Sequence, residues 1–285
     1  MTDIQPRRSA LYLPAINERA IAKARTMTCD AVILDLEDSV APDQKAQARD
    51  NAVCALAEGG FAAREVVIRV NGHDTPWHQA DVTAVRSARP DALLLPKVSA
   101  PDDVLRCAAM LDGDMPIWAM IETARSLFHL DAIAATARTG RLACLVIGTN
   151  DLVKELRATP APDRAIIIPF LMSALAAARA HDLSILDGVF NTLDDEADFI
   201  AECRQGAAMG FDGKTLIHPR QIDACHDAYS PGPDDIAWAR TVIAAFDQDD
   251  NRQKGVIRID GKMVERLHLA QARQVMALAD ATFPP

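Results

Sequence analysis

Short apolar segments rich in β-forming residues alternate with helical segments along most of this chain, and that alternation restricts the fold more than any other feature. Eight candidate strands are residues 9–14, 31–37, 66–71, 92–97, 117–122, 143–148, 184–190 and 210–218. Candidate helices between them include residues 17–28, 101–111 and 164–180. Alternating strands and helices form parallel β/α units, and eight units predict an α/β fold closed into a (β/α)₈ barrel. The alternative is an open doubly wound sheet, but the G-x-G-x-x-G turn expected after its first strand is missing.

The pattern changes after His218, and the chain of 285 residues is somewhat longer than a barrel of about 250 residues requires. A break at Ser230-Pro-Gly-Pro is followed by a candidate helix at residues 234–246, a short strand at 256–259 and a final helix at 263–279. We therefore predict a catalytic barrel at residues 1–230 and a C-terminal helical extension at residues 231–285. The extension is expected to act as a lid or an oligomer arm.

The charge and the cysteines restrict the partners and the compartment. A net charge of −10 gives no general attraction to nucleic acid or to anionic membranes. No run of 18 uncharged apolar residues is present, and the N-terminus has no apolar signal core. The six cysteines are irregularly spaced without a C-x-x-C pair, which indicates reduced thiols, most of them buried. We expect a cytoplasmic protein that binds neither nucleic acid nor membranes.

Ionisable residues stand at the ends of nearly all the predicted strands, where barrel enzymes carry their catalytic groups. Glu122 and Asp151 follow neighbouring strands, so their carboxylates can converge above the barrel. Two carboxylates with open remaining positions suit Mg²⁺, which keeps water and substrate oxygens as further ligands. The alternative is that each carboxylate caps the helix that follows it.

Arg69 lies near the end of the third predicted strand, and a buried arginine needs an anionic partner. It either binds a substrate carboxylate or forms an internal ion pair with Glu37 or Asp38, and both can hold together. Asp35 and Glu37 alternate along one face of the second strand, so they require cationic partners, for which Lys97 and Arg69 are the candidates. His218 precedes a proline, and a structural role is favoured for it.

Seven motifs in order resemble one known family. They are R-S-A-L-Y-L-P from Arg8, D-L-E-D-S-V from Asp35, R-V-N from Arg69, L-P-K ending at Lys97, I-E-T-A from Ile121, G-T-N-D-L from Gly148 and G-F-D-G-K-T-L-I-H-P from Gly210. The set resembles the citrate lyase β-subunit-like family, within the superfamily of HpcH/HpaI aldolases and malyl-CoA lyases. Each motif is weak by itself, but their order over nearly the whole chain is specific.

The resemblance implies a (β/α)₈ barrel and a set of site residues. Glu122 and Asp151 match the positions of the Mg²⁺ ligands, and Glu122 is also expected to contact the substrate. Arg69 matches a substrate-binding arginine that acts in catalysis. The residues that match positions contacting coenzyme A in relatives are Tyr12, Arg19, Lys23, Thr215 and Leu216.

The resemblance also assigns a role to the C-terminal extension. In CoA-lyase relatives the last helix is a lid that reaches across a trimer interface, and the segment G-K-M-V-E-R matches one that carries a catalytic acid. That acid is usually Asp, whereas this chain has Glu265, so its geometry departs from the pattern. A second departure is Ser126, where relatives often have Gly. We expect a homotrimer in which Glu265 serves a neighbouring site.

The activity that the resemblance implies is Mg²⁺-dependent cleavage or formation of a 3-hydroxyacyl-CoA thioester, such as malyl-, citramalyl- or citryl-CoA. The products are an acyl-CoA and a 2-oxo acid. Two alternatives remain at this point. One is the β subunit of a citrate lyase complex, which acts on an acyl-carrier-protein thioester, and the other is a pyruvate-type aldolase that does not use CoA.

Overall fold

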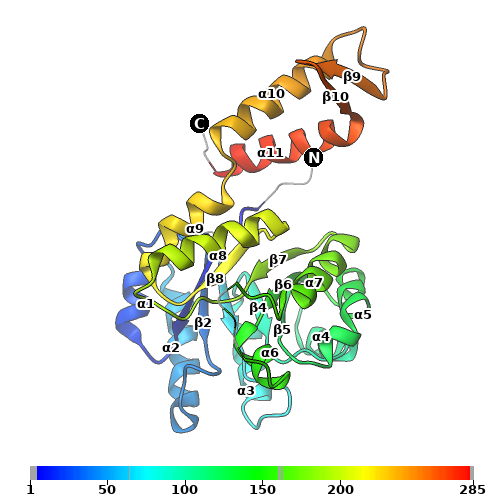
Figure 1. The fold of residues 1–285 in the computed structure, drawn as a ribbon. Helices are drawn as coiled ribbons and strands as arrows, with labels where there is room; N and C mark the ends of the chain where they lie inside the picture. The colour runs from blue at the N-terminus through cyan, green and yellow to red at the C-terminus, as the bar shows by residue number, and fades with distance from the viewer. Residues whose placement is uncertain (1–4, 64, 160, 162, 283–285) are drawn as a thin grey trace. The chain divides into compact units, whose positions relative to one another are not determined.

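The computed structural model describes residues 5–63, 65–159, 161 and 163–282. Its main feature is a closed barrel of parallel strands in chain order, which confirms the predicted (β/α)₈ fold (Figure 1). The barrel strands are β1 (Ser9–Pro14), β2 (Ala31–Asp35), β3 (Glu65–Arg69), β4 (Ala92–Leu95), β5 (Ile117–Ile121), β6 (Leu142–Ile147), β7 (Ser184–Asp187) and β8 (Gly213–Leu216). Because all the strands are parallel, their carboxyl ends meet at one rim.

Helices surround the barrel on the outside, as the alternating pattern predicts (Figure 1). They are α1 (Glu18–Ala24), α2 (Lys45–Glu58), α3 (His78–Ala88), α4 (Pro101–Met110), α5 (Leu130–Ala134), α6 (Thr149–Glu155), α7 (Ile168–Ala180), α8 (Glu196–Met209) and α9 (Ile222–Tyr229). Short 3₁₀ helices are η1 (Pro42–Gln44), η2 (Ser126–Phe128), η3 (Ala135–Arg138) and η4 (Pro219–Gln221). Small and branched side chains such as Ala10, Ile33 and Val67 fill the interior.

The end of the barrel where the strands begin is closed by one arginine. Arg7 donates to Glu65 at 2.7 Å and to Ser184 at 2.9 Å, the first residues of β3 and β7. Its guanidinium lies 5.1 Å from the ring centroid of Trp118, which is fully buried in the barrel core. The indole and the ion pair together fill this end, so the opposite rim is the open one.

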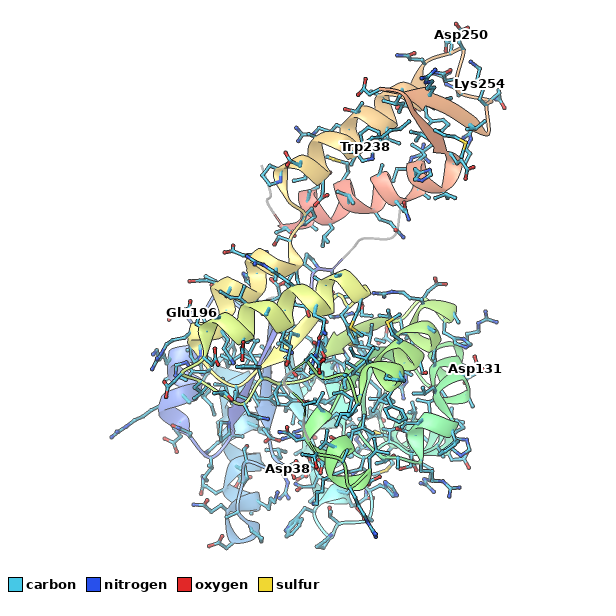
Figure 2. All side chains as sticks on the ribbon, in the orientation of Figure 1. Asp38, Asp131, Glu196, Trp238, Asp250 and Lys254 are labelled. Carbon is cyan, nitrogen blue, oxygen red and sulfur yellow. The ribbon has the colours of Figure 1, made fainter. Side chains whose placement is uncertain are left out.

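Residues after the barrel form a second compact unit, which begins at Tyr229, while Arg7–Ala228 form the first. The second unit contains α10 (Pro233–Asp247), the antiparallel strands β9 (Val256–Ile259) and β10 (Lys262–Glu265), and α11 (Arg266–Thr282). The two helices lie side by side and the hairpin joins them at one end (Figure 1). Trp238 belongs to α10 (Figure 2), and the Lys262 ammonium lies 5.4 Å from the centroid of its ring.

The structure corrects one expectation about this extension. Residues 262–265 are a strand, so the final helix begins at Arg266 and not at residue 263. The apolar face of that helix is buried within its own unit, because Leu269 and Ala272 lie in one cluster with Val242 and Phe246 of α10.

Other boundaries differ by a few residues. All the strands except β1 end one to three residues earlier than predicted, so Lys97 and Glu122 lie just beyond their strands while Arg69 is the last residue of β3. The helix predicted from residue 164 begins at Ile168. All six cysteines are free, and five of them are buried, as expected. Among the described residues, no helix is both long and apolar enough to cross a membrane.

Candidate active site

A cavity of about 300 Å³ lies among the loops that follow the strands, at the open rim of the barrel. Five of the residues selected from the sequence line it, although they come from distant parts of the chain: Tyr12, Arg69, Glu122, Asp151 and Thr215. The carboxyl ends of parallel strands are the usual place for the active site of a barrel enzyme. We therefore take this cavity as the candidate active site.

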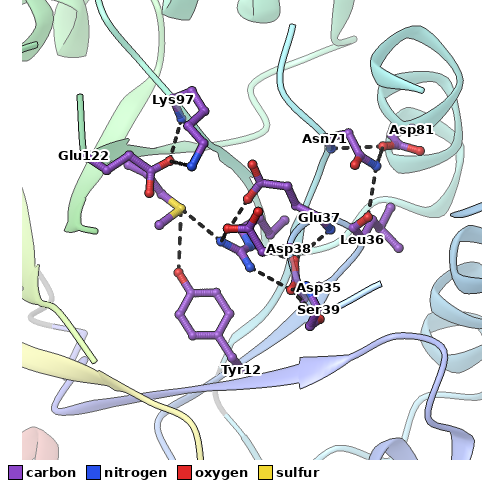
Figure 3. Close-up of polar contacts among 12 residues, drawn as sticks. Tyr12, Asp35, Leu36, Glu37, Asp38, Ser39, Asn71, Asp81, Lys97 and Glu122 are labelled. Carbon is purple, nitrogen blue, oxygen red and sulfur yellow. Dashed lines mark hydrogen bonds and ion pairs between the residues drawn. The ribbon is translucent and has the colours of Figure 1, made fainter. Parts of the chain in front are cut away.

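Arg69 is fixed on one side of the cavity by the acids of β2. Its Nε and Nη2 donate to the two carboxylate oxygens of Asp35 at 2.6 and 2.7 Å, a bidentate pair that sets the plane of the guanidinium (Figure 3). Burial alone would lower the pKa of Arg69, but Asp35 and its other neighbours raise it well above the ordinary value. The internal ion pair expected as an alternative is thus present, with Asp35 as the main partner.

The remaining nitrogen of Arg69, Nη1, lies 2.9 Å from Glu37 and 3.7 Å from the exposed Asp38. The Glu37 oxygen at 2.9 Å makes no aligned hydrogen bond, so the contact is an ion pair only. Burial raises the pKa of Glu37 to about 8, and Arg69 opposes this shift without cancelling it because its charge is shared with Asp35. Glu37 is therefore a carboxyl group that holds its proton near neutral pH.

An apolar wall joins Arg69 to the first strand. The guanidinium lies 4.8 Å from the ring centroid of Tyr12, and the Tyr12 hydroxyl donates to the Met120 sulfur at 3.8 Å (Figure 3). A cation over an aromatic face is attracted by the ring, and the attraction grows as water is excluded. Tyr12 and Met120 thus restrict Arg69 to one orientation at the cavity surface.

Glu122 and Asp151 meet on the opposite side of the cavity, where both contact the ammonium of Lys97. The Lys97 Nζ lies 3.5 Å from Glu122 Oε1, and the Lys97 backbone N–H donates to the same oxygen at 2.8 Å (Figure 3). The Lys97 ammonium also donates to Asp151 Oδ2. We had expected Lys97 to pair with Asp35 and Glu37. Instead its ammonium lies between the two candidate metal ligands.

The buried position of Glu122 depends on the absence of a side chain at Gly148. A Cβ atom built on Gly148 would lie 2.3 Å from Glu122 Oε2 and 2.5 Å from its Cβ, so any larger residue would displace the carboxylate. Burial raises the pKa of Glu122, although Lys97 opposes the shift. Burial would lower the pKa of Lys97, but Glu122 and Asp151 outweigh it and raise it. The site thus favours a positive charge between the carboxylates.

These contacts fit the Mg²⁺ site that the sequence predicts. Two carboxylates converge on one cation, here the ammonium, and no group of three or more His, Cys, Asp or Glu side chains forms a metal cluster among the described residues. An ion held by two carboxylates keeps its other positions for water and substrate oxygens, as Mg²⁺ prefers. The capping alternative is wrong for the helices that follow, because η2 and α6 have no side-chain cap.

The residues expected to bind coenzyme A are only partly gathered here. Tyr12 and Thr215 line the cavity, but Arg19, Lys23 and Leu216 are not among its described lining residues. Arg19 and Lys23 are exposed on α1, and Leu216 is fully buried. A role for the two basic residues therefore requires a ligand that extends beyond the cavity, and Leu216 can contribute only its backbone.

Two more predicted residues have defined local roles. The Nδ1 atom of His218 accepts from the Arg220 N–H at 3.1 Å and caps η4, so the structural interpretation of His218 is confirmed. Glu265, the expected lid acid, is the last residue of β10 in the smaller unit and immediately precedes α11. Its backbone N–H donates to His268 at 2.9 Å, and its side chain is half-buried.

Sequence reasoning missed the polar residues that complete the wall next to Asp151. Asn150 and Asn191 line the cavity, and their side-chain amides bond to each other. Asn150 stood in the quoted segment G-T-N-D-L, next to a candidate ligand, and that position was the available signal. Asn191 carried no such signal, because only the barrel closure brings the loop after β7 beside the loop after β6.

Known proteins resemble this chain over most of its length. A (3S)-malyl-CoA thioesterase of Cereibacter sphaeroides is 47% identical over 276 residues, covering 97% of this chain and 95% of that protein. The mitochondrial citramalyl-CoA lyase of Homo sapiens is 31% identical, covering 96% and 86%. The citrate lyase subunit beta of Escherichia coli is 32% identical, covering 96% and 93%.

Solved structures agree with these relatives. The protein CitE from Mycobacterium tuberculosis, in complex with magnesium, acetoacetate and coenzyme A, superposes with a TM-score of 0.80 at 29% identity, covering 96% of this chain and 98% of that one. A family model described as HpcH/HpaI aldolase/citrate lyase matches residues 8–219, which include every barrel strand. The chain therefore belongs to the HpcH/HpaI aldolase/citrate lyase family of enzymes.

Proposed function

We propose that this enzyme is a Mg²⁺-dependent lyase that cleaves a 3-hydroxyacyl-CoA thioester, such as malyl-CoA or citramalyl-CoA, into an acyl-CoA and a 2-oxo acid. The observation that supports this most is the pair Glu122 and Asp151, which converge on one cation across the cavity from Arg69. The CitE structure with magnesium and coenzyme A also supports a metal and a CoA ester as ligands in this family.

The proposed roles follow from what each residue can do. Glu122 and Asp151 would hold Mg²⁺, which supplies a Lewis acid for the carboxylate and hydroxyl oxygens of the substrate. Asp35 clamps one edge of Arg69, so Nη1 is the part that can donate to a substrate oxygen as negative charge develops there. A donor fixed before the reaction needs no reorganisation during it.

Cleavage breaks the bond between C2 and C3 of the acyl group as the 3-hydroxyl loses its proton. The electron pair remains on C2 of the acyl-CoA, and that carbon must then take a proton. Glu265 is our candidate donor in a neighbouring subunit, because its position matches the lid acid of CoA-lyase relatives. The reaction in the opposite direction would use the same residue as the base.

A second candidate function is hydrolysis of the thioester, and the 47% identity to a (3S)-malyl-CoA thioesterase favours it. Hydrolysis breaks the bond between the carbonyl carbon and sulfur, adds water and leaves a free thiol. No carbanion forms at C2, so this reaction does not require the proton from Glu265. The same metal pair and Arg69 would bind the carboxylate end of either substrate.

One assay separates these reactions. We expect purified enzyme with malyl-CoA and Mg²⁺ to yield acetyl-CoA and glyoxylate without releasing thiol, whereas hydrolysis would yield malate and free CoA, detected with a thiol reagent. Glu122→Ala should abolish turnover while the thermal unfolding curve stays cooperative, because one of two protein ligands is lost. An active Glu122→Ala enzyme in the presence of EDTA would disprove the metal site.

The same assay tests the two remaining alternatives. An acyl-carrier-protein-dependent subunit would leave free CoA esters intact, and a pyruvate-type aldolase would act on hydroxy oxo acids that lack CoA. We expect neither, since the relative that is 47% identical over 97% of this chain is named for malyl-CoA, whereas the citrate lyase subunit beta is 32% identical.

A further inference from the structure

A second cavity of about 510 Å³ adjoins the candidate active site. The two cavities share four lining residues, Thr149, Asn150, Val189 and Asn191, which belong to the start of α6 and to the loop after β7. Asn150 directly precedes Asp151, so this shared wall stands next to the proposed metal. A group bound at the metal is therefore separated from the second cavity only by these residues.

The shared wall is closed by a reciprocal amide pair. Asn191 Nδ2 donates to Asn150 Oδ1 at 2.7 Å, and Asn150 Nδ2 donates to Asn191 Oδ1 at 3.3 Å. Both residues are exposed, so water can replace each bond when the side chains part. The pair is thus a partition that side-chain rotation alone can open.

The backbone segments that carry Asn150 and Asn191 cannot move apart as their side chains can. A Cβ atom on Gly188 would lie 2.6 Å from Thr149 Cγ2 and 2.7 Å from its Oγ1, so the loop after β7 packs directly on the start of α6. The gap between the loops is therefore fixed at its base. Only the amides above it can change the passage from one cavity to the other.

The charges around the second cavity indicate what it accepts. Arg164 lines it, but its guanidinium donates to both oxygens of the buried Asp187 and to Gln205, so its charge is neutralised within the protein. Glu202 also lines the cavity but is paired with the buried Lys214 at 2.6 Å, so the acids that oppose an anion are Asp195 and Asp198. The other walls include Val153, Ile167 and Phe190. These surfaces suit a neutral alkyl group.

The position of the second cavity, beside the loops after β6 and β7, indicates which substituent of the substrate it could receive. Around the barrel, Arg69 follows β3, Glu122 follows β5 and Asp151 follows β6, while the expected CoA contacts Tyr12 and Thr215 belong to β1 and β8. We place the carboxylate and hydroxyl of the substrate at the metal and its thioester toward β1 and β8. The remaining substituent at the hydroxyl-bearing carbon can then face the shared wall after β6 and β7, next to Asp151.

We propose that the Asn150–Asn191 pair limits the size of the substituent on the hydroxyl-bearing carbon, and that the second cavity receives a neutral alkyl group there when the pair opens. This inference rests on the proposed function and narrows its substrate class. It assigns a specificity role to two residues that touch neither the metal nor the reacting bond. A second carboxylate in that position is disfavoured by the acids of the cavity.

The test uses binding of 2-oxo acids to the Mg²⁺-loaded protein, measured by calorimetry. Glyoxylate carries no substituent, 2-oxopentanoate carries a propyl group, and 2-oxoglutarate has the same carbon chain with a second carboxylate. We expect Asn191→Ala to improve the affinity for 2-oxopentanoate relative to glyoxylate by at least about tenfold, the scale of a few methylene groups in a pocket. The affinity for 2-oxoglutarate should not improve.

Two further variants make the result specific. Val153→Phe added to Asn191→Ala should fill the second cavity and remove the gain for 2-oxopentanoate while leaving glyoxylate binding in place. Gln47→Ala is the matched control, because it removes an exposed amide–amide bond to Asn51 on α2, away from both cavities. If all proteins bind glyoxylate but the preference for 2-oxopentanoate never changes, this inference is wrong and the proposed function survives. If the wild-type protein binds no 2-oxo acid, both are wrong.

Discussion

Among single residues, Lys97 has the strongest influence on the charge of the candidate metal site. Its ammonium contacts both Glu122 and Asp151, and its backbone adopts a left-handed conformation with φ of 55°. Such a conformation is unfavourable for a residue with a side chain, and it is kept where the surroundings fix it. Here the backbone N–H of Lys97 is held by Glu122, so the lysine is part of the site even without a metal.

Lys97 and Mg²⁺ compete for the same carboxylates, and this gives a prediction about affinity. Removing the ammonium in Lys97→Met leaves two carboxylates that repel each other, so a dication should bind more tightly, by about tenfold. Isothermal titration of the substrate-free protein with Mg²⁺ measures this. Lys154→Met, which removes an exposed lysine of α6, should leave the affinity unchanged. Weaker binding in Lys97→Met would mean that the lysine supports the ion.

Glu37 predicts a dependence of stability on pH. Burial raises its pKa to about 8, whereas the unfolded chain has the ordinary value near 4.5. The native state therefore keeps a proton that the unfolded state loses, and stability falls as pH rises from about 4.5 to 8. Glu37→Gln is always neutral, so in EDTA its Tm should match the wild type near pH 5 and exceed it at pH 9 by roughly 3 °C or more.

Asp38 supplies the comparison for Glu37, because it lies next in the chain but is exposed. Asp38→Asn should change the Tm equally at pH 5 and pH 9. A difference between Glu37→Gln and the wild type that does not grow with pH would show that Glu37 is ionised throughout. The sequence predicted that the acids of β2 pair with Arg69, but it could not say that one of them keeps its proton, because that depends on how Asp35 shares the arginine.

At the scale of elements, the passage from β6 to α6 fixes the geometry of the metal pair. The strand ends at Ile147, Gly148 alone joins it to the helix that begins at Thr149, and Asp151 lies in the first turn of that helix. The same glycine leaves the space that Glu122 occupies from β5. One short connection thus places one ligand and makes room for the other.

A methyl group at Gly148 tests this arrangement. Gly148→Ala would bring a Cβ to 2.5 Å from the Cβ of Glu122, a contact that moving the carboxylate alone cannot relieve. We expect at least about a hundredfold loss of kcat/KM, since small misplacement of a catalytic group has effects on this scale. Gly113→Ala is a surface control, because no atom lies within 4 Å of its added Cβ, although its positive φ carries a small cost in stability. Wild-type activity in Gly148→Ala would contradict the placement of Glu122.

The elements show where sequence reasoning succeeds and where it stops. The order of the eight strands followed from their alternation with helices, and their ends supplied Arg69, Glu122 and Asp151, whereas Tyr12 and Thr215 came from the family resemblance. The strand β10 was missed because its four residues continue the pattern of the helix after it. The dipeptide Asp260-Gly261, with φ of 47° and 80°, is a hairpin signal that would have found it. The contacts of Lys97 and Asn191 could not be predicted, since they depend on side-chain orientation after closure.

At the scale of the whole molecule, the smaller unit provides the test of the expected trimer. Glu265 belongs to that unit, whereas Arg69 belongs to the barrel, so the two can be altered in separate chains. Glu265→Gln removes the carboxylate but keeps the size of the side chain. If the reaction is cleavage, kcat should fall by about 10²-fold or more with little change in KM, the usual scale for a general acid or base.

Mixing variants then shows whether the acid acts between chains. Glu265→Gln and Arg69→Ala proteins, each inactive, should regain part of the activity when their subunits exchange, because some mixed sites have both residues. Glu265→Asp should retain activity, since Asp is the usual residue in relatives. No recovery after demonstrated exchange would place the acid within its own chain or remove it from the mechanism. An unchanged kcat in Glu265→Gln together with thiol release would favour hydrolysis.

Side chains fill the barrel interior down to Trp118 and Arg7, so reactants can reach the candidate active site only from the rim above it. Because the site has a single entrance, the reactant that binds deepest must bind first and leave last. In the proposed lyase the small oxo acid lies beneath the bulky thioester, so acyl-CoA must depart before it, and the oxo acid must enter first when the reaction is reversed. Compulsory ordering of this kind predicts a different inhibition pattern for each product, so the filled core of the barrel would set the order of steps in the catalytic cycle.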